Sequence, residues 1–317
     1  IVYGEDFGSF INYLTENEIN TVLDKCKNHL KHIIKTSEDF NNILKNSNVN
    51  TRKVVFEEAQ SVLPSVIKNG LDFLLITEYL TESQRKEVFD LCKKNQFKII
   101  KNIDDLCYVL INIAEDQQNE IINTIYKDKL PTIIKNSHDF SEALKGFPQH
   151  LKSTVLNQFE ENLIGFIKNG KDLREILSCL DTNKRNEVFN RCKSKLPAVI
   201  KNSTDLKNAF FCLIPDQQKE MLEICKHKLP NIIKNGDGFT GITEMYFYHQ
   251  EPIPDFIFNA LTAELPPLIK NGKEFARMLM PLRLEDQKKL LNLPDIKRAM
   301  PHFIKNIEVE IPCILNV

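Results

Sequence analysis

The sequence predicts an all-α fold, a right-handed α-solenoid of about eight to nine helical repeats of about 33 residues that stack into a curved rod or arc. Three observations predict it. The tripeptide Ile-Lys-Asn returns at nearly constant intervals, apolar residues within each interval follow a helical period, and strand patterns are essentially absent. A period of this size indicates an array that grows by adding units and not by enlarging one core.

The lysine of the repeated tripeptide, which reads Ile-Lys-Thr in the first copy, marks the period. Successive lysines are separated by 33, 33, 34, 33, 33, 33, 36 and 35 residues. These anchor lysines are Lys35, Lys68, Lys101, Lys135, Lys168, Lys201, Lys234, Lys270 and Lys305.

Each unit is predicted to contain a short helix that ends near the anchor lysine. Proline suits the first turn of a helix, where its missing N–H is no loss. A proline stands four residues before the lysine in six copies: Pro64, Pro131, Pro197, Pro230, Pro266 and Pro301. After the lysine, Asn followed by Gly, as in Asn69-Gly70, indicates the C-terminal end of this helix.

Two longer helices are predicted in the rest of the unit. An acidic residue four positions after the lysine, such as Asp72 or Asp172, is expected to cap the first long helix. Apolar residues then fall at helical intervals, as in the segment 173–180. The second long helix opens with a capping-box pattern at Thr81-Glu82-Ser83-Gln84 and continues with an apolar face at Val88, Phe89 and Cys92.

The repeat pattern also predicts how the chain is divided. Residues 1–35 are expected to form an N-terminal capping repeat, and residues 36–240 the regular repeats. Residues 241–270 are predicted to be an irregular repeat with an aromatic insertion, and residues 271–317 a C-terminal repeat and cap. The chain begins without methionine, so we expect a piece of a longer protein, and any catalysis would lie in a part that is not present here.

Composition and motifs exclude several classes of function. The formal net charge of −1 shows no basic excess of the kind that nucleic-acid binders usually carry. Zinc-ribbon, zinc-protease, P-loop, nucleophile-elbow and dinucleotide-binding patterns are missing, so we expect no catalytic residues, metal site or cofactor. Four cysteines share one repeat position, which indicates a small core site and reduced thiols: Cys26, Cys92, Cys192 and Cys225. No apolar run is long enough to span a bilayer.

The repeat Leu-Pro-x-x-Ile-Lys-Asn-x-x-Asp-Phe, followed by Leu-x-x-x-Gln-Arg-x-x-Val-Phe, resembles tandem helical repeats of bacterial type IV secretion effectors. The resemblance covers roughly Leu30 to Lys305. It implies delivery into a host cell, work in the host cytoplasm, and binding of a host protein or membrane component. The repeat length and the recurring Leu-Pro also resemble mitochondrial transcription termination factor repeats, which implies a nucleic-acid-binding arc.

The anchor lysines are one candidate site. Stacked lysines could follow a phosphate backbone or an acidic partner surface, through Lys68, Lys101, Lys135, Lys168, Lys201 and Lys234. The alternative is structural: each lysine would favour the dipole at the end of its short helix and pair with the aspartate four residues later. We favour the structural interpretation, because most of these lysines have their own acidic residue nearby.

The irregular repeat supplies the other candidate site. An interruption in a regular array often marks a functional loop, and aromatic side chains are favoured at interfaces. The interruption contains Tyr246, Phe247, Tyr248 and His249. A refilled core is the alternative interpretation for these side chains. The glutamines and arginine that open the second long helix, such as Gln84-Arg85 and Gln117-Gln118, are predicted to lie on a solvated helix face.

The leading hypothesis from the sequence is a non-catalytic repeat scaffold that binds a host protein as part of a secreted effector. The alternative is a nucleic-acid-binding helical repeat protein, which the net charge of −1 disfavours. The sequence does not identify the partner.

Overall fold

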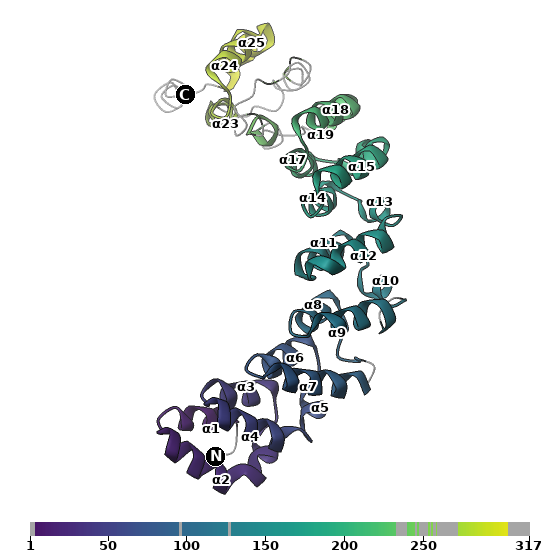
Figure 1. The fold of residues 1–317 in the computed structure, drawn as a ribbon. Coiled ribbons are helices and arrows are strands. Elements are labelled where there is room, and N and C mark those ends of the chain that lie inside the picture. The colour runs from purple at the N-terminus through teal and green to yellow at the C-terminus, as the bar shows by residue number, and fades with distance from the viewer. Residues whose placement is uncertain are drawn as a thin grey trace. The chain divides into compact units, whose positions relative to one another are not determined.

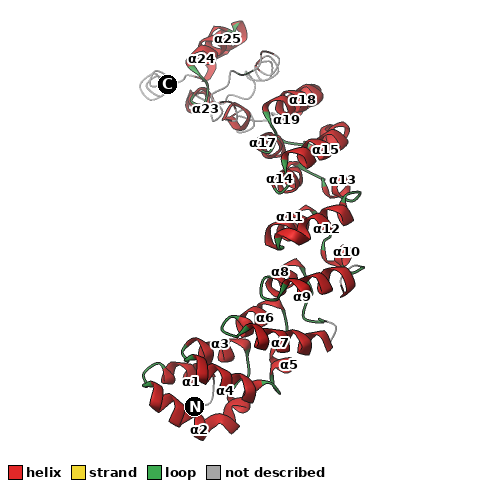
Figure 2. Ribbon diagram, in the orientation of Figure 1, coloured by secondary structure: helices red, strands yellow, loops and turns green. Residues whose placement is uncertain are grey.

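The computed structural model describes residues 4–94, 97–125, 128–232, 240–244, 246, 253, 255, 258 and 272–303. Every regular element within these residues is helical (Figure 2). The chain divides into two compact units, Ile1–Phe159 and Glu160–Val317. The predicted all-α repeat fold is therefore confirmed, whereas the predicted boundaries at residues 35, 240 and 270 remain predictions.

The repeats of the first unit pack in chain order (Figure 1). Its first long helices are α1 (Gly4–Ile11), α3 (Ser37–Lys45), α6 (Gly70–Thr77), α8 (Ile103–Leu110) and α11 (Ser137–Gly146). Its second long helices are α2 (Glu16–Ile33), α4 (Val49–Ala59), α7 (Glu82–Lys94), α9 (Glu115–Glu120) and α12 (Gln149–Phe159). A π-helical turn, Ile121–Ile125, continues α9, and the short helices are α5 (Leu63–Val66) and α10 (Leu130–Ile133). Each first long helix contacts its counterpart in the next repeat, from α1 through to α11.

The second unit continues the same order of elements. Its regular part contains α13 (Leu163–Phe166), α14 (Gly170–Ser178), α15 (Thr182–Cys192), α16 (Leu196–Val199), α17 (Ser203–Phe211), α18 (Pro215–Cys225) and α19 (Leu229–Ile232). Short 3₁₀ turns, Lys193–Lys195 and Lys226–Lys228, lead into α16 and α19. The described C-terminal helices are α23 (Gly272–Leu279), α24 (Leu284–Asn292) and α25 (Pro294–Phe303).

The core consists of apolar side chains that recur at the same repeat positions. The residue five positions after the anchor lysine is fully buried in each described repeat, for example Phe40, Phe73 and Leu173. The cysteine position is likewise internal, because Cys92, Cys192 and Cys225 are buried. Burial raises the pKa of the Cys92 thiol to about 12. These cysteines therefore act as small apolar residues, as the sequence predicted.

The start of each first long helix differs from the prediction. Asn69, Asn102, Asn136, Asn169 and Asn202 are N-caps of the following helix. Two of them, Asn69 and Asn169, stand before glycine and were expected to end the preceding helix. Asn69, for example, has extended backbone angles, and its side-chain oxygen accepts a hydrogen bond from the Asp72 amide at 2.8 Å. The aspartate is the third residue of the helix and not its cap. The asparagine caps an amide of its own helix, while the aspartate side chain accepts from the amide of the lysine that precedes the cap, as Asp72 does from Lys68.

Glycine after the N-cap asparagine allows adjacent repeats to approach closely. A Cβ atom on Gly70 would lie 2.2 Å from the Asp105 carbonyl oxygen, and one on Gly170 would lie 1.9 Å from that of Asp205. No described glycine has a positive φ angle. These glycines are therefore required for packing between repeats and not for a left-handed helix end.

The two polar residues at the start of the second long helix also lie in a different environment from the predicted one. Gln117, Gln118, Gln217 and Gln218 are buried, although a solvated face was expected. The Gln118 amide donates to the carbonyls of Leu110 at 2.8 Å and Ile113 at 2.9 Å. The carbonyls at the end of a helix lack partners within it. A side chain from the second long helix therefore completes the end of the first.

The connection between α7 and α8 departs from the other repeats. The position four residues before the anchor lysine is Phe97 there, and the described residues 97–99 form a turn where other repeats have a short helix. Phe97 has φ 47°, is fully buried, and lies 5.1 Å from the Phe89 ring. A positive φ is uncommon for a bulky residue and costs about 1–2 kcal/mol. Burial of the aromatic ring in the core offsets this cost.

Candidate nucleic-acid interface

The anchor lysines within the described residues lie on the surface, directly before the N-cap residue of a first long helix. Lys68 follows the C-cap residue Ile67 and precedes the N-cap Asn69. The anchor lysines with exposed side chains are Lys35, Lys68, Lys101, Lys135, Lys168 and Lys201. Lys234 lies outside the described residues. Each repeat that the structure describes therefore presents this lysine at an equivalent place.

The aspartate four residues later binds the backbone of its anchor lysine. The Lys68 amide donates to Oδ2 of Asp72 at 2.9 Å, and the Lys101 amide donates to Asp105 at 3.0 Å. The same bond recurs in the other repeats, for Lys35, Lys135, Lys168 and Lys201. A structural role for the Lys-Asn-x-x-Asp segment is thus present, but it involves the lysine amide and not its ammonium group.

The second oxygen of the aspartate joins adjacent repeats. Oδ1 of Asp105 accepts from the buried Gly70 amide at 2.8 Å, and Oδ1 of Asp205 accepts from the Gly170 amide at 3.1 Å. Ser37 replaces glycine in an earlier repeat, and its hydroxyl donates to Asp72. These carboxylates are therefore occupied on both oxygens. They hold the layers together and leave the lysine ammonium available for an external anion.

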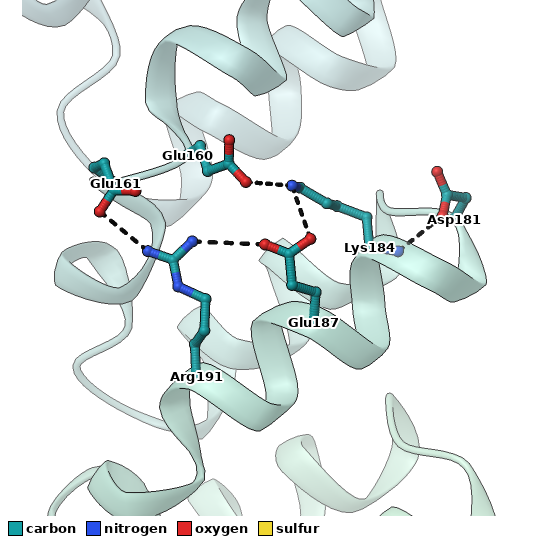
Figure 3. Close-up of polar contacts among 6 residues, drawn as sticks. All are labelled: Glu160, Glu161, Asp181, Lys184, Glu187 and Arg191. Atoms are coloured by element: carbon teal, nitrogen blue, oxygen red, sulfur yellow. Dashed lines mark hydrogen bonds and ion pairs between the residues drawn. The ribbon is translucent and has the colours of Figure 1, made fainter.

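Ion pairs on the second long helices contrast with the anchor lysines. Figure 3 shows Nζ of Lys184 on α15 between Glu160 at 2.5 Å and Glu187 at 3.0 Å. Arg191 pairs with Glu187 at 3.7 Å and with Glu161 at 3.3 Å. The hydrogen bond from Lys184 holds the pKa of Glu160 below its ordinary value. The positive charges of this network are balanced by carboxylates within the unit.

Within the part of the chain that the structure describes, the ammonium groups of five anchor lysines form no ion pair with a carboxylate. These five are Lys68, Lys101, Lys135, Lys168 and Lys201. The formal charge of −1 for the chain is therefore compatible with a row of lysine ammonium groups in each unit that form no internal ion pair. Such a row attracts phosphate groups.

The exposed face of the first long helices varies from repeat to repeat. The position three residues after the anchor lysine is exposed and holds Glu38, Leu71, Asp104, His138, Lys171 and Thr204. The position seven residues further, on the same helix face, is also exposed and holds Lys45, Glu78, Ile111, Lys145, Ser178 and Phe211. Each layer thus presents different chemistry beside an unchanged lysine.

A groove connects an anchor lysine to this variable face. Its volume is about 530 Å³, and it is lined by Lys35, Glu38, Asn41, Asn42 and the neighbouring Leu75, among others. Asn41 also crosses between the repeats, donating to the Leu75 carbonyl at 2.8 Å. The lysines and the variable positions therefore belong to one surface in this part of the first unit.

The aromatic candidate site falls mostly outside the described residues. Tyr246 is buried, and its ring lies 5.5 Å from that of Phe210. Phe247, Tyr248 and His249 lie outside the described residues. The only candidate of this group that the structure places, Tyr246, therefore packs in the interior of the second unit, and the role of the group stays a prediction.

Sequence reasoning missed two features of the interface. The first is the aspartate that joins adjacent repeats, which is invisible in a single copy because its partner belongs to another repeat. The second is Lys98, an extra lysine beside the ladder in the irregular turn after Phe97. The missing proline at position 97 was the signal that could have identified this turn.

The described part of the chain also limits other kinds of site. No group of three or more His, Cys, Asp or Glu side chains within it could hold a metal ion. None of its helices combines the length and the apolar composition needed to cross a membrane.

No family model and no curated protein sequence matches the chain. Among solved structures, it is similar to the Puf3 RNA binding domain bound to the Cox17 RNA 3′ UTR recognition sequence. For the site A complex, the identity is 12% over 96% of each chain, with a TM-score of 0.60. For the site B complex, the identity is 13% over 86% of this chain and 96% of the other, with a TM-score of 0.57. At this identity the likeness establishes the fold, a helical-repeat solenoid.

Proposed function

We propose that this chain is a non-catalytic scaffold that binds single-stranded RNA, with the anchor lysines on the phosphates and the variable helix faces beside the bases. The observation that carries the proposal is the row of exposed lysines whose aspartates are occupied by backbone amides. A positively charged row that follows the strand is the usual basis of single-strand binding. The variable positions next to it supply the means to prefer one sequence over another.

The comparisons support RNA as the class of partner. Both similar structures are RNA-binding domains in complex with an RNA recognition sequence, and the likeness extends over nearly their whole length. Neither comparison supports the effector resemblance, secretion or a host cytoplasmic location, which stay predictions. Tyr246, the one proposed aromatic anchor for a host protein that the structure describes, is buried.

The distribution of charge answers the objection raised by the net charge of −1. Basic side chains of α15 and its neighbours are neutralised within their unit, as are Lys93 by Glu120 and Lys193 by Glu220 at 3.0 Å. The anchor lysines are not neutralised in this way. A phosphate could therefore pair directly with these ammonium groups without breaking an internal ion pair, although the chain carries a formal net charge of −1.

The test is salt-dependent binding of a single-stranded RNA pool, measured by fluorescence anisotropy. Lys101→Ala combined with Lys201→Ala removes one anchor lysine from each unit. For single strands, the logarithm of affinity falls with the logarithm of salt concentration with a slope of about −0.7 per phosphate contact, so the variant should reduce the slope by about 1.4.

The matched control removes the same formal charge elsewhere. Lys86→Ala combined with Lys219→Ala changes exposed lysines on α7 and α18, and these should leave the slope unchanged. A slope that falls equally in both double variants, or the absence of RNA binding at low salt, would overturn the proposal. Equal affinity for DNA of the same sequence would overturn the assignment to RNA.

A further inference from the structure

A pocket in the first unit combines three lysines with an apolar lining. Its volume is about 450 Å³, and it lies between the repeats of α5 and α8. Lys68, Lys98 and Lys101 line it, and the remaining lining residues are Pro64, Ile67, Leu91, Cys92 and Ile99. None of the lining residues is acidic. The pocket therefore offers three positive charges and apolar walls to a ligand.

Two other pockets in the same unit lack this character. The groove at Lys35 contains Glu38 and Asp39, so its acidic residues outnumber its lysine. The pocket between α4 and α7, of about 530 Å³, contains Arg52 and Lys53 but also Glu57 and Glu87. The excess of lysine over acidic residues is therefore specific to the pocket at Lys98 and is not a general result of how the repeats pack.

The irregular turn is the source of the extra lysine. Lys98 stands three residues before its anchor lysine, where the first described copy has His32 and the others have Ser65, Thr132, Gly165, Ala198 and Asn231. Phe97 precedes it with φ 47° and a fully buried ring, and so replaces the proline-led short helix by a turn. The strained backbone and the added lysine thus occur together, beside one pocket.

None of the three lysines has its ammonium group in an ion pair within the described residues. The aspartates nearest to the two anchor lysines, Asp72 and Asp105, bind backbone amides through Oδ2. Each also accepts a hydrogen bond on Oδ1 from the preceding repeat. The three ammonium groups are therefore not held in contact with these carboxylates and can pair with a ligand.

The charge of the pocket discriminates between kinds of phosphate. An internal phosphodiester carries one negative charge, and one anchor lysine per repeat matches it. A terminal phosphate monoester carries about 1.5–2 negative charges at neutral pH. A terminal monoester together with the adjacent diester therefore comes close to the three positive charges of the lysines. The apolar walls fit the flat face of a base or the apolar side of a ribose.

We propose that this pocket binds a nucleotide through a terminal phosphate monoester, with the phosphate on Lys68, Lys98 and Lys101 and the base against the apolar walls. Where the nucleotide is the end of an RNA strand, the proposal rests on the proposed function and adds recognition of the strand end. A free mononucleotide would offer the same terminal monoester without the adjacent diester. The experiment therefore separates the two sources.

The first arm compares RNA oligonucleotides of one sequence that carry either a phosphate or a hydroxyl at each end. Lys98→Ser introduces the residue that the preceding repeat has at this position, Ser65, and leaves both anchor lysines in place. The native chain should bind the oligonucleotide with a phosphate at one of its ends roughly tenfold more tightly than the oligonucleotide with a hydroxyl at that end. The reason is that a hydrogen bond between charged groups is among the stronger polar contacts. Lys98→Ser should remove this preference and keep the affinity for the hydroxyl form.

The matched control is Lys94→Ala, an exposed lysine at the end of α7 that does not line the pocket. It should keep the preference for the phosphorylated end. Circular dichroism of both variants confirms that they fold. If Lys98→Ser lowers the affinity for both oligonucleotides equally, the lysine is a general phosphate contact, and the inference is overturned.

The second arm titrates adenosine 5′-monophosphate and adenosine into the chain without RNA. Binding of the monophosphate but not of adenosine, lost in Lys98→Ser, supports the pocket even if no oligonucleotide binds, a result that would overturn only the proposed function. Preference for a phosphorylated RNA end without monophosphate binding identifies the strand as the source. If neither a phosphorylated end nor the monophosphate shows dependence on Lys98, the inference fails.

Discussion

Replacement of Asp105 by alanine should disrupt the contact between two adjacent repeats. The carboxylate is buried and accepts hydrogen bonds from the Gly70 amide at 2.8 Å and the Lys101 amide at 3.0 Å. Alanine leaves both amides without this partner. A buried donor without a partner costs about 1–3 kcal/mol. Water reaches the Lys101 amide more easily than the Gly70 amide, so the cost at Lys101 is at the lower end. The two losses together should lower the free energy of unfolding by about 2–4 kcal/mol.

The neighbouring residue Asp104 provides the control for this variant. It is exposed and lies in the same first turn of α8, so Asp104→Ala also removes a negative charge near the helix N-terminus. Loss of that interaction with the helix dipole costs below about 1 kcal/mol. The difference between the two variants therefore isolates the hydrogen bonds from the helix dipole.

Urea unfolding followed by far-UV circular dichroism gives the free energies, and hydrogen exchange gives the location. In Asp105→Ala the Gly70 amide, which is bonded across the repeat boundary, should exchange faster, while the amides inside α6 should keep most of their protection. If Asp105→Ala is no more destabilising than Asp104→Ala and the Gly70 amide stays protected, the aspartate does not hold the repeats together.

Three further predictions concern packing, ion pairs and thiols. Gly70→Ala should destabilise the first unit, because its Cβ would lie 2.2 Å from the Asp105 carbonyl oxygen, whereas Gly165→Ala should be neutral or stabilise by about 0.4–1 kcal/mol in urea unfolding, since nothing lies within 4 Å of its Cβ. Glu160 should titrate below 4.5 by NMR and return toward that value in Lys184→Met. Because the pKa of Glu160 is lower in the folded state, its stabilising effect is present above 4.5 and is lost as pH falls through the folded value. Five of the eight thiols should react slowly with a thiol reagent in the native chain at neutral pH and rapidly in denaturant, because burial raises their pKa to about 11–12: Cys92, Cys107, Cys192, Cys212 and Cys225.

In the proposed interface, the residues that recur in the repeats and the residues that vary between repeats have different roles. The lysine, asparagine and aspartate keep the same geometry in the repeats from Lys68 to Lys201, so a phosphate contact can recur at each of these layers. Exposed positions such as Leu71 and Lys171 occupy the same place in their repeats but differ in charge and polarity. Binding strength would then depend mainly on the lysines, and preference for a sequence on the variable side chains.

The candidate site was only partly predictable. The lysine row follows from the period alone, and all five of its described members are exposed. The sequence interpretation nevertheless favoured a structural role, because it paired each ammonium group with the nearby aspartate. The structure assigns that aspartate to the amide of the same lysine and to the next layer. Which donor binds the aspartate carboxylate, the lysine ammonium group or a backbone amide, depends on three-dimensional geometry. The spacing of residues in the sequence does not specify that geometry.

The sequence by itself determined the all-helical repeat architecture, because helical periodicity, proline at helix starts and capping residues act within a few residues of one another. The tertiary structure decided which groups meet across repeats. Gly70 and Asp105 are 35 residues apart, and the burial of Gln118 depends on carbonyls of another helix. The turn at Phe97, with the lysine that follows it, arises from packing of an aromatic ring into the core. Such contacts depend on the arrangement of whole layers, so local sequence patterns could not reveal them.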